Sequence, residues 1–340
     1  MHSSFEHLTR REFLKEVSVA GAAALLGAQR DSLAAEPPPE TTKLRLIRTP
    51  ALCQAPQYAS EELLRSEGFT DVQEARVEGD ITARIQALAS RQGDILSTYV
   101  GPLITRVDAG DPIVILTGLH VGCFELFGSD RIRAIRDLKG RTINVTEMGG
   151  AAHLHLASIL SYVGLNPRKD VNFVTHPGAE AIKLLADGKI DAYIAFPPDP
   201  QELRAKKIGH VLVNSAMDRP WAQYFCCMVA ANREFVRKNP VATKRALRAI
   251  LKTVNICALE PERIARLLVD KGYSKNYDYA LGTLKDIPYG KWREYDSEDT
   301  VRFYSLRLNE IGMVKNNPQK IISQGTDWRY LRELKKELKA

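Results

Sequence analysis

The chain has 340 residues, with 48 Lys and Arg against 41 Asp and Glu, and a net charge of +7. Beyond the N-terminal segment, the sequence has no apolar stretch long enough to span a membrane. This length is enough for two domains of ordinary size. Basic residues are scattered among acidic ones without a clustered stripe, which argues against nucleic acid as a partner, and five cysteines without a CxxC pair argue against a zinc-finger framework or a dense disulfide scaffold.

The first 34 residues have the pattern of an export signal. Arg10 and Arg11 stand in the sequence TRREFLK, and an uncharged run follows from 17 to 27. The paired arginines match the twin-arginine signal, and 32–34 (Ser-Leu-Ala) gives a cleavage site before Ala35. The apolar run is shorter than the roughly 20 residues that span a bilayer. We therefore expect a soluble mature protein in the periplasm, without a membrane anchor.

After a flexible, proline-rich linker at 35–42, strand-like and helix-like segments alternate. The expected strands are 44–49, 72–77, 94–100 and 113–119, and the expected helices between them are 58–67, 81–91 and a short one ending at 109. Short apolar strands that alternate with amphipathic helices indicate βαβ units around a mostly parallel sheet. The sequence thus predicts a first α/β lobe.

The same alternation restarts after Gly122. The expected strands are 124–127, 141–146, 171–175, 191–196 and 210–213, with helices at 153–163 and 179–187. A strand at 224–230 then returns to the first lobe, and helices follow at 240–259, 261–271, 277–284, 299–311 and from 327. We expect lobe I to comprise 43–121 and 224–340, and lobe II to comprise 122–223. Crossings at 120–123 and 220–223 would form a hinge.

Four segments carry a family resemblance: AGDPIV at 109–114, DLKGRTI at 137–143, LADGKIDA at 185–192 and ANREFVRKNP at 231–240. In this order, from about 43 to 255, the chain resembles the periplasmic substrate-binding proteins of ABC importers, in the nitrate/sulfonate/taurine or NMT1/THI5-like branch. The resemblance implies a type-II-like fold of two α/β lobes that close on a small-molecule ligand, and an ABC permease in the inner membrane as partner. We expect a monomer without a cofactor.

Ligands of open α/β sheets bind beyond the carboxyl ends of the strands, so the loops there supply the candidate binding residues. Gly149 and Gly150 precede a helix and would leave backbone N–H groups free for an anion or a polar oxygen, although a simple glycine turn is the alternative. The candidates are Gln54, Tyr58, Tyr99, His120, Gly149, Gly150, Ala151, His153, His176, Glu180, Phe196 and Tyr224.

The predicted cleft loops contain no Lys or Arg. A strongly anionic ligand would gain charge-assisted bonds from arginine, so this absence argues against a charge-driven site. The aromatic residues and imidazoles of these loops suit a planar heterocycle or a small organic acid. A sulfonate bound by helix N-termini remains an alternative ligand. We expect binding by stacking and neutral hydrogen bonds.

Histidine and cysteine patterns in the chain suggest other functions. Histidines at strand ends, with Cys123 close to His120, suggest a metal site. The sequence has no HxxxH or HExxH spacing, and the histidine loops belong to different lobes, so we expect no metal ligands.

Cys226 and Cys227 occupy a place similar to a cysteine-rich run of fungal pyrimidine synthases, but with two cysteines instead of four. Buried cysteine also packs as a small apolar residue. We expect a binding protein rather than an enzyme, with a cysteine-dependent or pyrimidine-forming enzyme and a periplasmic sensor subunit as alternatives.

Overall fold

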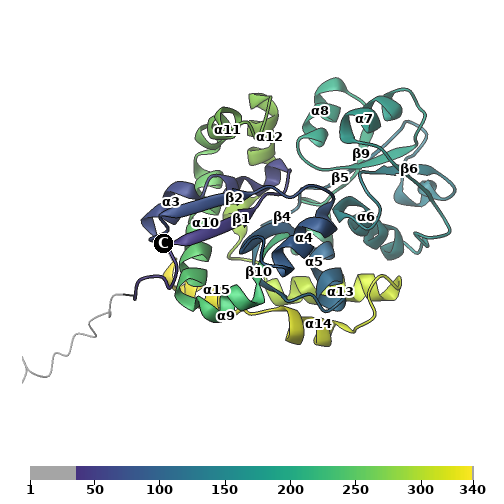
Figure 1. Ribbon diagram of the computed structural model, residues 1–340. Coiled ribbons are helices and arrows are strands. Elements are labelled where there is room, and N and C mark those ends of the chain that lie inside the picture. The colour runs from purple at the N-terminus through teal and green to yellow at the C-terminus, as the bar shows by residue number, and fades with distance from the viewer. Residues whose placement is uncertain (1–35, 339–340) are drawn as a thin grey trace, which may run out of the picture. The chain divides into compact units, whose positions relative to one another are not determined.

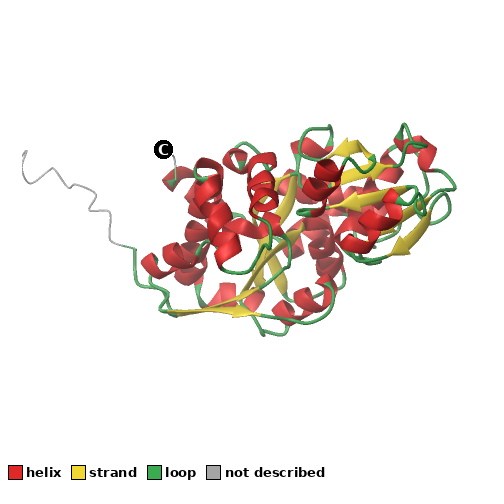
Figure 2. Ribbon diagram, turned by 90° about the horizontal axis from the view of Figure 1, so that it is seen from above, coloured by secondary structure: helices red, strands yellow, loops and turns green. Residues whose placement is uncertain are grey.

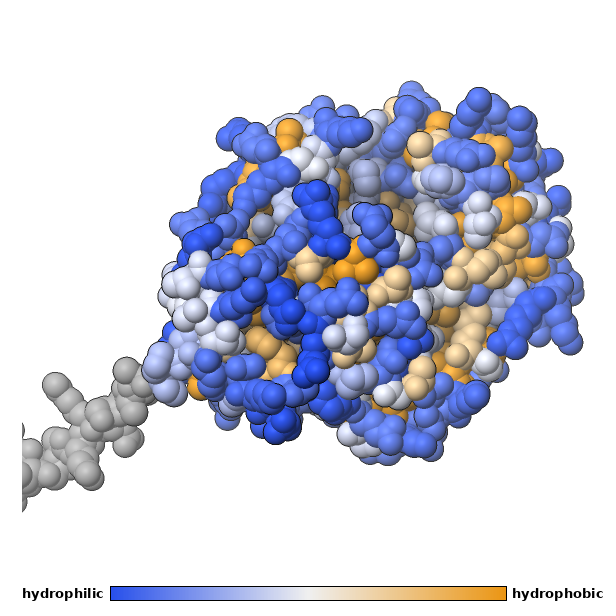
Figure 3. Space-filling model, viewed as in Figure 1, coloured by the Kyte–Doolittle hydropathy of each residue, from blue (hydrophilic) through white to orange (hydrophobic). Residues whose placement is uncertain are grey.

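The computed structural model describes residues 36–338, and the described chain forms one compact unit from Pro39 onward. The expected export signal and its cleavage site lie outside the described residues. Within the described part, none of the helices combines the length and apolarity that crossing a bilayer requires. The molecular face in Figure 3 is largely hydrophilic, with hydrophobic residues exposed in small groups.

The first sheet has the order β2-β1-β3-β10-β4 (Figure 1). Its strands are β1 (Lys43–Ile47), β2 (Asp71–Ala75), β3 (Ile95–Tyr99), β4 (Ile113–Val121) and β10 (Phe225–Asn232). β1 is parallel to β2 and β3, whereas β10 is antiparallel to both β3 and β4. Every residue of β3, β4 and β10 is buried, as continuous apolar strands covered on both faces require.

The second sheet repeats this plan in the order β7-β6-β8-β5-β9. Its strands are β5 (Glu125–Gly128), β6 (Thr142–Val145), β7 (Asn172–Thr175), β8 (Ala192–Ala195) and β9 (His210–Asn214). β6 is parallel to β7 and β8, and β5 is the antiparallel strand, between β8 and β9. The predicted fold, two mostly parallel sheets followed by a helical C-terminal region, is confirmed. The chain passes between the sheets after β4 and after β9, and the lobe limits at 122 and 224 stay a prediction.

Helices pack against the strands of both sheets (Figure 2). Around the first sheet they are η1 (Leu52–Gln54), α2 (Ala55–Tyr58), α3 (Glu61–Ser66), α4 (Ile81–Ala89) and α5 (Val100–Asp108). The single helix predicted at 58–67 is wrong: α2 and α3 are separate, and α2 begins earlier, with Pro56 in its first turn. The Ser60 hydroxyl donates to the Gln57 carbonyl (2.8 Å), a local bond that competes with continuation of the helix.

The helices of the second sheet are η2 (Ile135–Leu138), α6 (Ala151–Tyr162), α7 (Gly178–Ala186) and α8 (Asp199–Lys206). After η3 (Trp221–Gln223) and β10 come the C-terminal helices: α9 (Arg233–Lys238), α10 (Pro240–Leu259), α11 (Pro261–Asp270), α12 (Tyr277–Asp286), η4 (Tyr289–Lys291), α13 (Ser297–Glu310), α14 (Pro318–Gly325) and α15 (Arg329–Glu337). The helices α8, α9 and α14 were not among those expected from the sequence.

Glu40, in the predicted linker, caps α10. Its carboxylate accepts hydrogen bonds from the N–H groups of Val241 (3.0 Å) and Ala242 (2.9 Å). Partial burial opposes ionisation of Glu40, but these backbone bonds outweigh it and lower the pKa. The linker is therefore attached to the folded unit at this residue, where the charge also suits the helix N-terminus.

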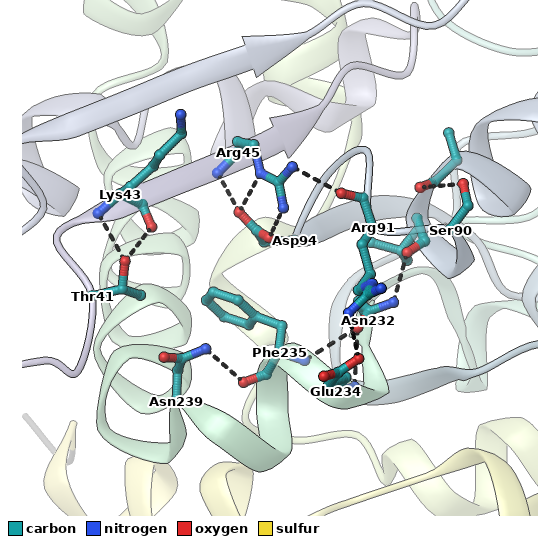
Figure 4. Close-up of polar contacts among 12 residues, drawn as sticks. Thr41, Lys43, Arg45, Ser90, Arg91, Asp94, Asn232, Glu234, Phe235 and Asn239 are labelled. Atoms are coloured by element: carbon teal, nitrogen blue, oxygen red, sulfur yellow. Dashed lines mark hydrogen bonds and ion pairs between the residues drawn. The ribbon is translucent and has the colours of Figure 1, made fainter.

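An ion pair joins β1 to the start of β3 (Figure 4). The Asp94 carboxylate accepts hydrogen bonds from the backbone N–H (2.8 Å), Nε (3.1 Å) and Nη2 (2.7 Å) of Arg45. The guanidinium group pairs with both carboxylate oxygens, and the Asp94 side chain is only 7% exposed, so little water reaches this carboxylate.

We expect Asp94→Ala to lower the free energy of unfolding by about 2 kcal/mol, because it leaves the Arg45 donors unsatisfied. Asp71→Ala is the matched control. Its carboxylate pairs with Lys43 at 3.8 Å while half exposed, and it should change stability by no more than about 0.5 kcal/mol. Urea unfolding measures both changes, and equal losses would contradict a special role for Asp94.

Candidate functional site

A pocket of about 290 Å³ lies at the carboxyl ends of strands from both sheets. Residues after β1, β6 and β8, the end of β3, the first turn of α4, the connection after β4, and β10 form its lining. They are Thr49, Pro50, Ala51, Cys53, Gln54, Gly79, Ile81, Arg84, Thr98, Tyr99, Cys123, Phe124, Thr146, Glu147, Ala151, Phe196 and Cys227. This is where open α/β sheets bind ligands.

Aromatic rings form one wall of the pocket. Phe124 meets Tyr99 edge to face with ring centroids 5.2 Å apart, and meets Phe196 at 6.1 Å. The Tyr99 hydroxyl is 3.0 Å from Nδ1 of the buried His155, which fixes the orientation of the Tyr99 ring. The wall is therefore held in place before any ligand arrives.

Two charged side chains also line the pocket. Nε of Arg84 is buried and has no hydrogen bond partner among the described residues. Burial, followed by the charge of Asp80, raises the pKa of Glu147, while Arg84 acts in the opposite direction. The cleft loops do lack Lys and Arg, but α4 supplies a cation. This corrects the expectation of a site without positive charge.

Thiols form the floor of the pocket. Cys53, Cys123 and Cys227 line it, and the Cys123 Sγ is 3.0 Å from the Cys226 Sγ. The Gln54 amide donates to the Cys227 Sγ (3.1 Å). Burial opposes ionisation of Cys227, but hydrogen bonds from Cys123, Cys226 and Cys53 outweigh it and hold the pKa of this thiol well below its ordinary value. All five cysteines of the chain are buried and free.

Of the predicted binding residues, Gln54, Tyr99, Ala151 and Phe196 line the pocket. His120 does not reach the lining. It lies within the buried thiol cluster, and its side chain has no exposed area.

Tyr58 and Tyr224 serve packing elsewhere. The Tyr58 hydroxyl donates to the Thr49 carbonyl, and its ring stacks on Tyr273 with centroids 4.2 Å apart. Tyr224 stacks on Phe303 with centroids 4.0 Å apart. Neither is part of the pocket lining.

The glycine segment before α6 has mainly a local role. The N–H of Gly149 donates to Nδ1 of His153 (3.1 Å), so this donor is already used and the expected free N–H is wrong for Gly149. A Cβ on Gly150 would lie 2.1 Å from the Glu147 side chain, so the glycine makes room for that carboxylate. Burial lowers the pKa of His153.

His176 and Glu180 also lie outside the lining. Nδ1 of His176 is 3.1 Å from Oε1 of Glu180, one turn further along at the start of α7. The backbone N–H of His176 donates to Oδ1 of Asn144 (2.9 Å). These contacts stay within the second sheet and its helix.

The candidates that sequence reasoning missed include Arg84, Glu147 and Phe124. A signal for Arg84 was present. Asp80 is the N-cap of α4, accepting from the Ala83 N–H (2.8 Å), so Ile81 and Arg84 lie three residues apart on one helix face. Arg84 lies in a helix and not in a strand-end loop, so the rule that ligands bind at strand ends does not include it.

The fold is that of the periplasmic binding proteins. The nitrate-binding protein NrtA from Synechocystis PCC 6803 superposes with a TM-score of 0.73 at 15% identity, covering 89% of this chain and 90% of that one. The alkanesulfonate-binding protein SsuA from Xanthomonas axonopodis pv. citri, bound to MOPS, gives a TM-score of 0.66 at 16% identity, covering 87% and 100%. At these identities the likeness shows the fold alone.

Sequence comparison defines the family. The nitrate/nitrite binding protein NrtA of Synechococcus elongatus is 24% identical over 212 residues, which are 59% of this chain and 47% of that protein. The match thus spans about half the length of this curated relative. The profile of the NMT1-like family matches residues 54–268, more than half of the chain. The protein belongs to the NMT1-like family, as its four sequence segments indicated.

His155 should make the folded state sensitive to acid. Burial lowers its pKa from 6.5 to about 3. As the pH falls below about 6.5, the unfolded chain takes up a proton that the folded chain does not, so stability falls by up to about 1.4 kcal/mol per pH unit. The loss continues until the pH nears 3.

His155→Gln keeps an acceptor for Tyr99 but cannot titrate, so its stability should decline less steeply between pH 6 and 4. His210→Gln, at the start of β9, is the control and should keep the steep decline. Urea unfolding at several pH values gives both slopes. Parallel curves for the two variants would exclude His155 as the cause.

Proposed function

We propose that the protein is the solute-binding component of an ABC importer, and that it captures a small organic anion between its two lobes. The observation that carries the proposal is the pocket itself, whose lining comes from the strand ends of both sheets and combines Arg84 with an aromatic wall. The family supports a binding role, and its relatives are named as binding proteins for nitrate, nitrite and alkanesulfonates.

The lining suggests the chemistry of the ligand. The buried, unpartnered Nε of Arg84 suits an oxygen of a carboxylate or sulfonate, since such a bond is charge-assisted. Tyr99, Phe124 and Phe196 suit an apolar or planar body. Glu147 opposes a second negative charge. The volume of about 290 Å³ fits a small molecule.

The proposal extends to location and partners. Export through the twin-arginine signal would bring the protein to the periplasm, where it would act as a monomer and deliver its ligand to a permease in the inner membrane. Catalysis is not part of the proposal.

A contact between α8 and α12 suggests how closure is held. Arg204 on α8 pairs with Glu125 of β5 and with Asp286 at the end of α12. Nε2 of Gln201 donates to the same Asp286 carboxylate (3.0 Å). This contact ties the second sheet to the C-terminal helices. Rotation about 122–124 and 215–224, where the chain passes between the sheets, would open it.

A thermal-shift screen should identify the ligand among nitrate, alkanesulfonates and aromatic carboxylates, since a ligand at 100 times its Kd adds about 2.7 kcal/mol. For the compound found, Arg84→Met should weaken binding about 10- to 100-fold, because a hydrogen bond to a charged group contributes about 1.5–3 kcal/mol. Added salt should also weaken binding to the native chain. Calorimetry measures both effects.

Arg76→Met is the control, because the Arg76 side chain is largely exposed beside Glu74. It should leave affinity unchanged. Equal affinities for the Arg84 and Arg76 variants would exclude Arg84 as the anion contact. A screen in which no small organic anion stabilises the protein, or in which nitrate alone does, would contradict the proposed ligand class.

Closure should be visible by small-angle X-ray scattering. We expect the ligand to reduce the radius of gyration of the native chain. Asp286→Ala should reduce the ligand-induced compaction and lower the affinity, because it removes the acceptor shared by Arg204 and Gln201. Lys206→Gln, whose partner Glu202 lies on the same helix, is the control. Identical dimensions with and without a confirmed ligand would rule out closure.

A further inference from the structure

Four side chains of the pocket floor bring metal-ligand atoms together. Cys53 lies on η1, His120 near the end of β4, Cys123 just after β4, and Cys227 on β10. One ligand atom from each lies within 4.8 Å of all the others, and all four residues are buried. They come from three distant parts of the chain, so folding alone assembles the cluster.

The spacing is close to that of a tetrahedral metal site. With metal–sulfur bonds of about 2.3 Å, neighbouring ligand atoms are roughly 3.8 Å apart. The observed limit of 4.8 Å therefore requires a contraction of no more than about 1 Å. Side-chain rotation at three thiols can supply it.

The imidazole of His120 is oriented as a metal ligand would be. Its Nδ1 is 3.0 Å from the carbonyl oxygen of Gly122. Because a carbonyl oxygen only accepts, Nδ1 carries the proton and Nε2 keeps its lone pair. Nε2 is buried and has no hydrogen bond partner in the part of the chain that the structure describes. A backbone carbonyl that fixes the tautomer is the usual support of a metal-bound histidine.

Gln54 supports the thiols from outside the cluster. Its Nε2 donates to Sγ of Cys227 (3.1 Å) and lies 3.6 Å from Sγ of Cys53. Donors of this kind stabilise negative charge on sulfur. The side chain is 1% exposed, so it is held in this place by packing.

The cluster is accessible from the pocket. Cys53, Cys123 and Cys227 are part of the lining, so an ion can reach all three sulfurs by the route a solute would use. Three thiolates around a divalent ion leave one net negative charge. Arg84 in the same lining offers a counter-charge.

We propose that the floor of the pocket binds one thiophilic metal ion of the Zn²⁺ class, with the sulfurs of Cys53, Cys123 and Cys227 and Nε2 of His120 as its four ligands. The sequence argued against a metal site because its histidine loops belong to different lobes. The site proposed here uses only one histidine, and its other three ligands are cysteines around the first sheet. Binding would release the thiol protons, so affinity rises with pH. The inference does not rest on the proposed transport of an organic anion.

The test uses the full chain, purified with its thiols reduced and under exclusion of air. Titration with Co²⁺ should give thiolate-to-metal charge-transfer absorption and the visible bands of tetrahedral cobalt, saturating at one ion per chain. Zn²⁺ should abolish these bands by displacing cobalt. Competition with a chromophoric chelator then gives the Zn²⁺ affinity.

Cys53→Ser, Cys123→Ser, Cys227→Ser and His120→Gln should each weaken Zn²⁺ binding by about 100-fold or more, and Gln54→Leu by about 10-fold. Cys257→Ser is the matched control: this cysteine is equally buried, on α10 and outside the cluster. It should bind Zn²⁺ as the native chain does. Circular dichroism without metal shows which variants are folded, and in the native chain Zn²⁺ should raise the melting temperature.

Three outcomes would overturn the proposal. One is cobalt binding without thiolate absorption. Another is a Zn²⁺ affinity that is the same in the Cys227 and Cys257 variants. The third is a disulfide between Cys123 and Cys226 that persists in the reduced preparation and excludes the ion. Zn²⁺ binding in a protein that binds no organic anion would sustain this inference while contradicting the proposed ligand class.

Discussion

The placement of β10 between β3 and β4 is the constraint on which the pocket depends. Its register puts Cys227 opposite Tyr99 on one side and His120 on the other. The pairing with β4 is irregular at Cys227, and such bulges direct side chains toward sites. A slip of one residue would turn Cys227 to the other face of the sheet and separate the cluster.

Both ends of β10 are fixed by specific contacts. At its end, Nδ2 of Asn232 donates to the Leu88 and Ala89 carbonyls (2.9 and 3.0 Å), while Oδ1 accepts from the first turn of α9. At its start, the Phe225 ring fills the space above Gly118, where a Cβ would lie 2.3 Å from the ring. The aromatic wall and the thiol floor thus share one rigid support.

The sequence predicted most of the fold because its strands are short apolar segments bounded by turn residues, and because four family segments occur in order. It missed α8, whose sequence DPQELRAK has Leu203 as its single large apolar residue; this helix buries Pro200, Gln201 and Leu203 and is held by contacts of Arg204 and Gln201 with distant residues. Periodicity cannot reveal a helix of this kind.

The site was harder to predict because the side chains that form it are positioned by partners distant in the sequence. The rule that ligands bind at strand ends identified Gln54, Tyr99 and Phe196, but the direction of a large side chain depends on its partners. Tyr58 turns to Tyr273, more than two hundred residues away in the chain. Sequence spacing also could not show that Cys53 meets Cys227, because only the completed sheet brings them together.

The position of β10 also has a consequence for the order of folding. Its residues pair with β3 and β4, which precede it by about a hundred residues, and the whole second sheet lies between them in the sequence. Until Asn232 has been synthesised, the facing edges of β3 and β4 have no partner, and unpaired apolar edges favour aggregation. Pairing over such a distance has a high loop-closure cost and slows folding. During synthesis the edges of β3 and β4 therefore stay unpaired for a long interval, and a first sheet that formed early would be prone to aggregation in that interval.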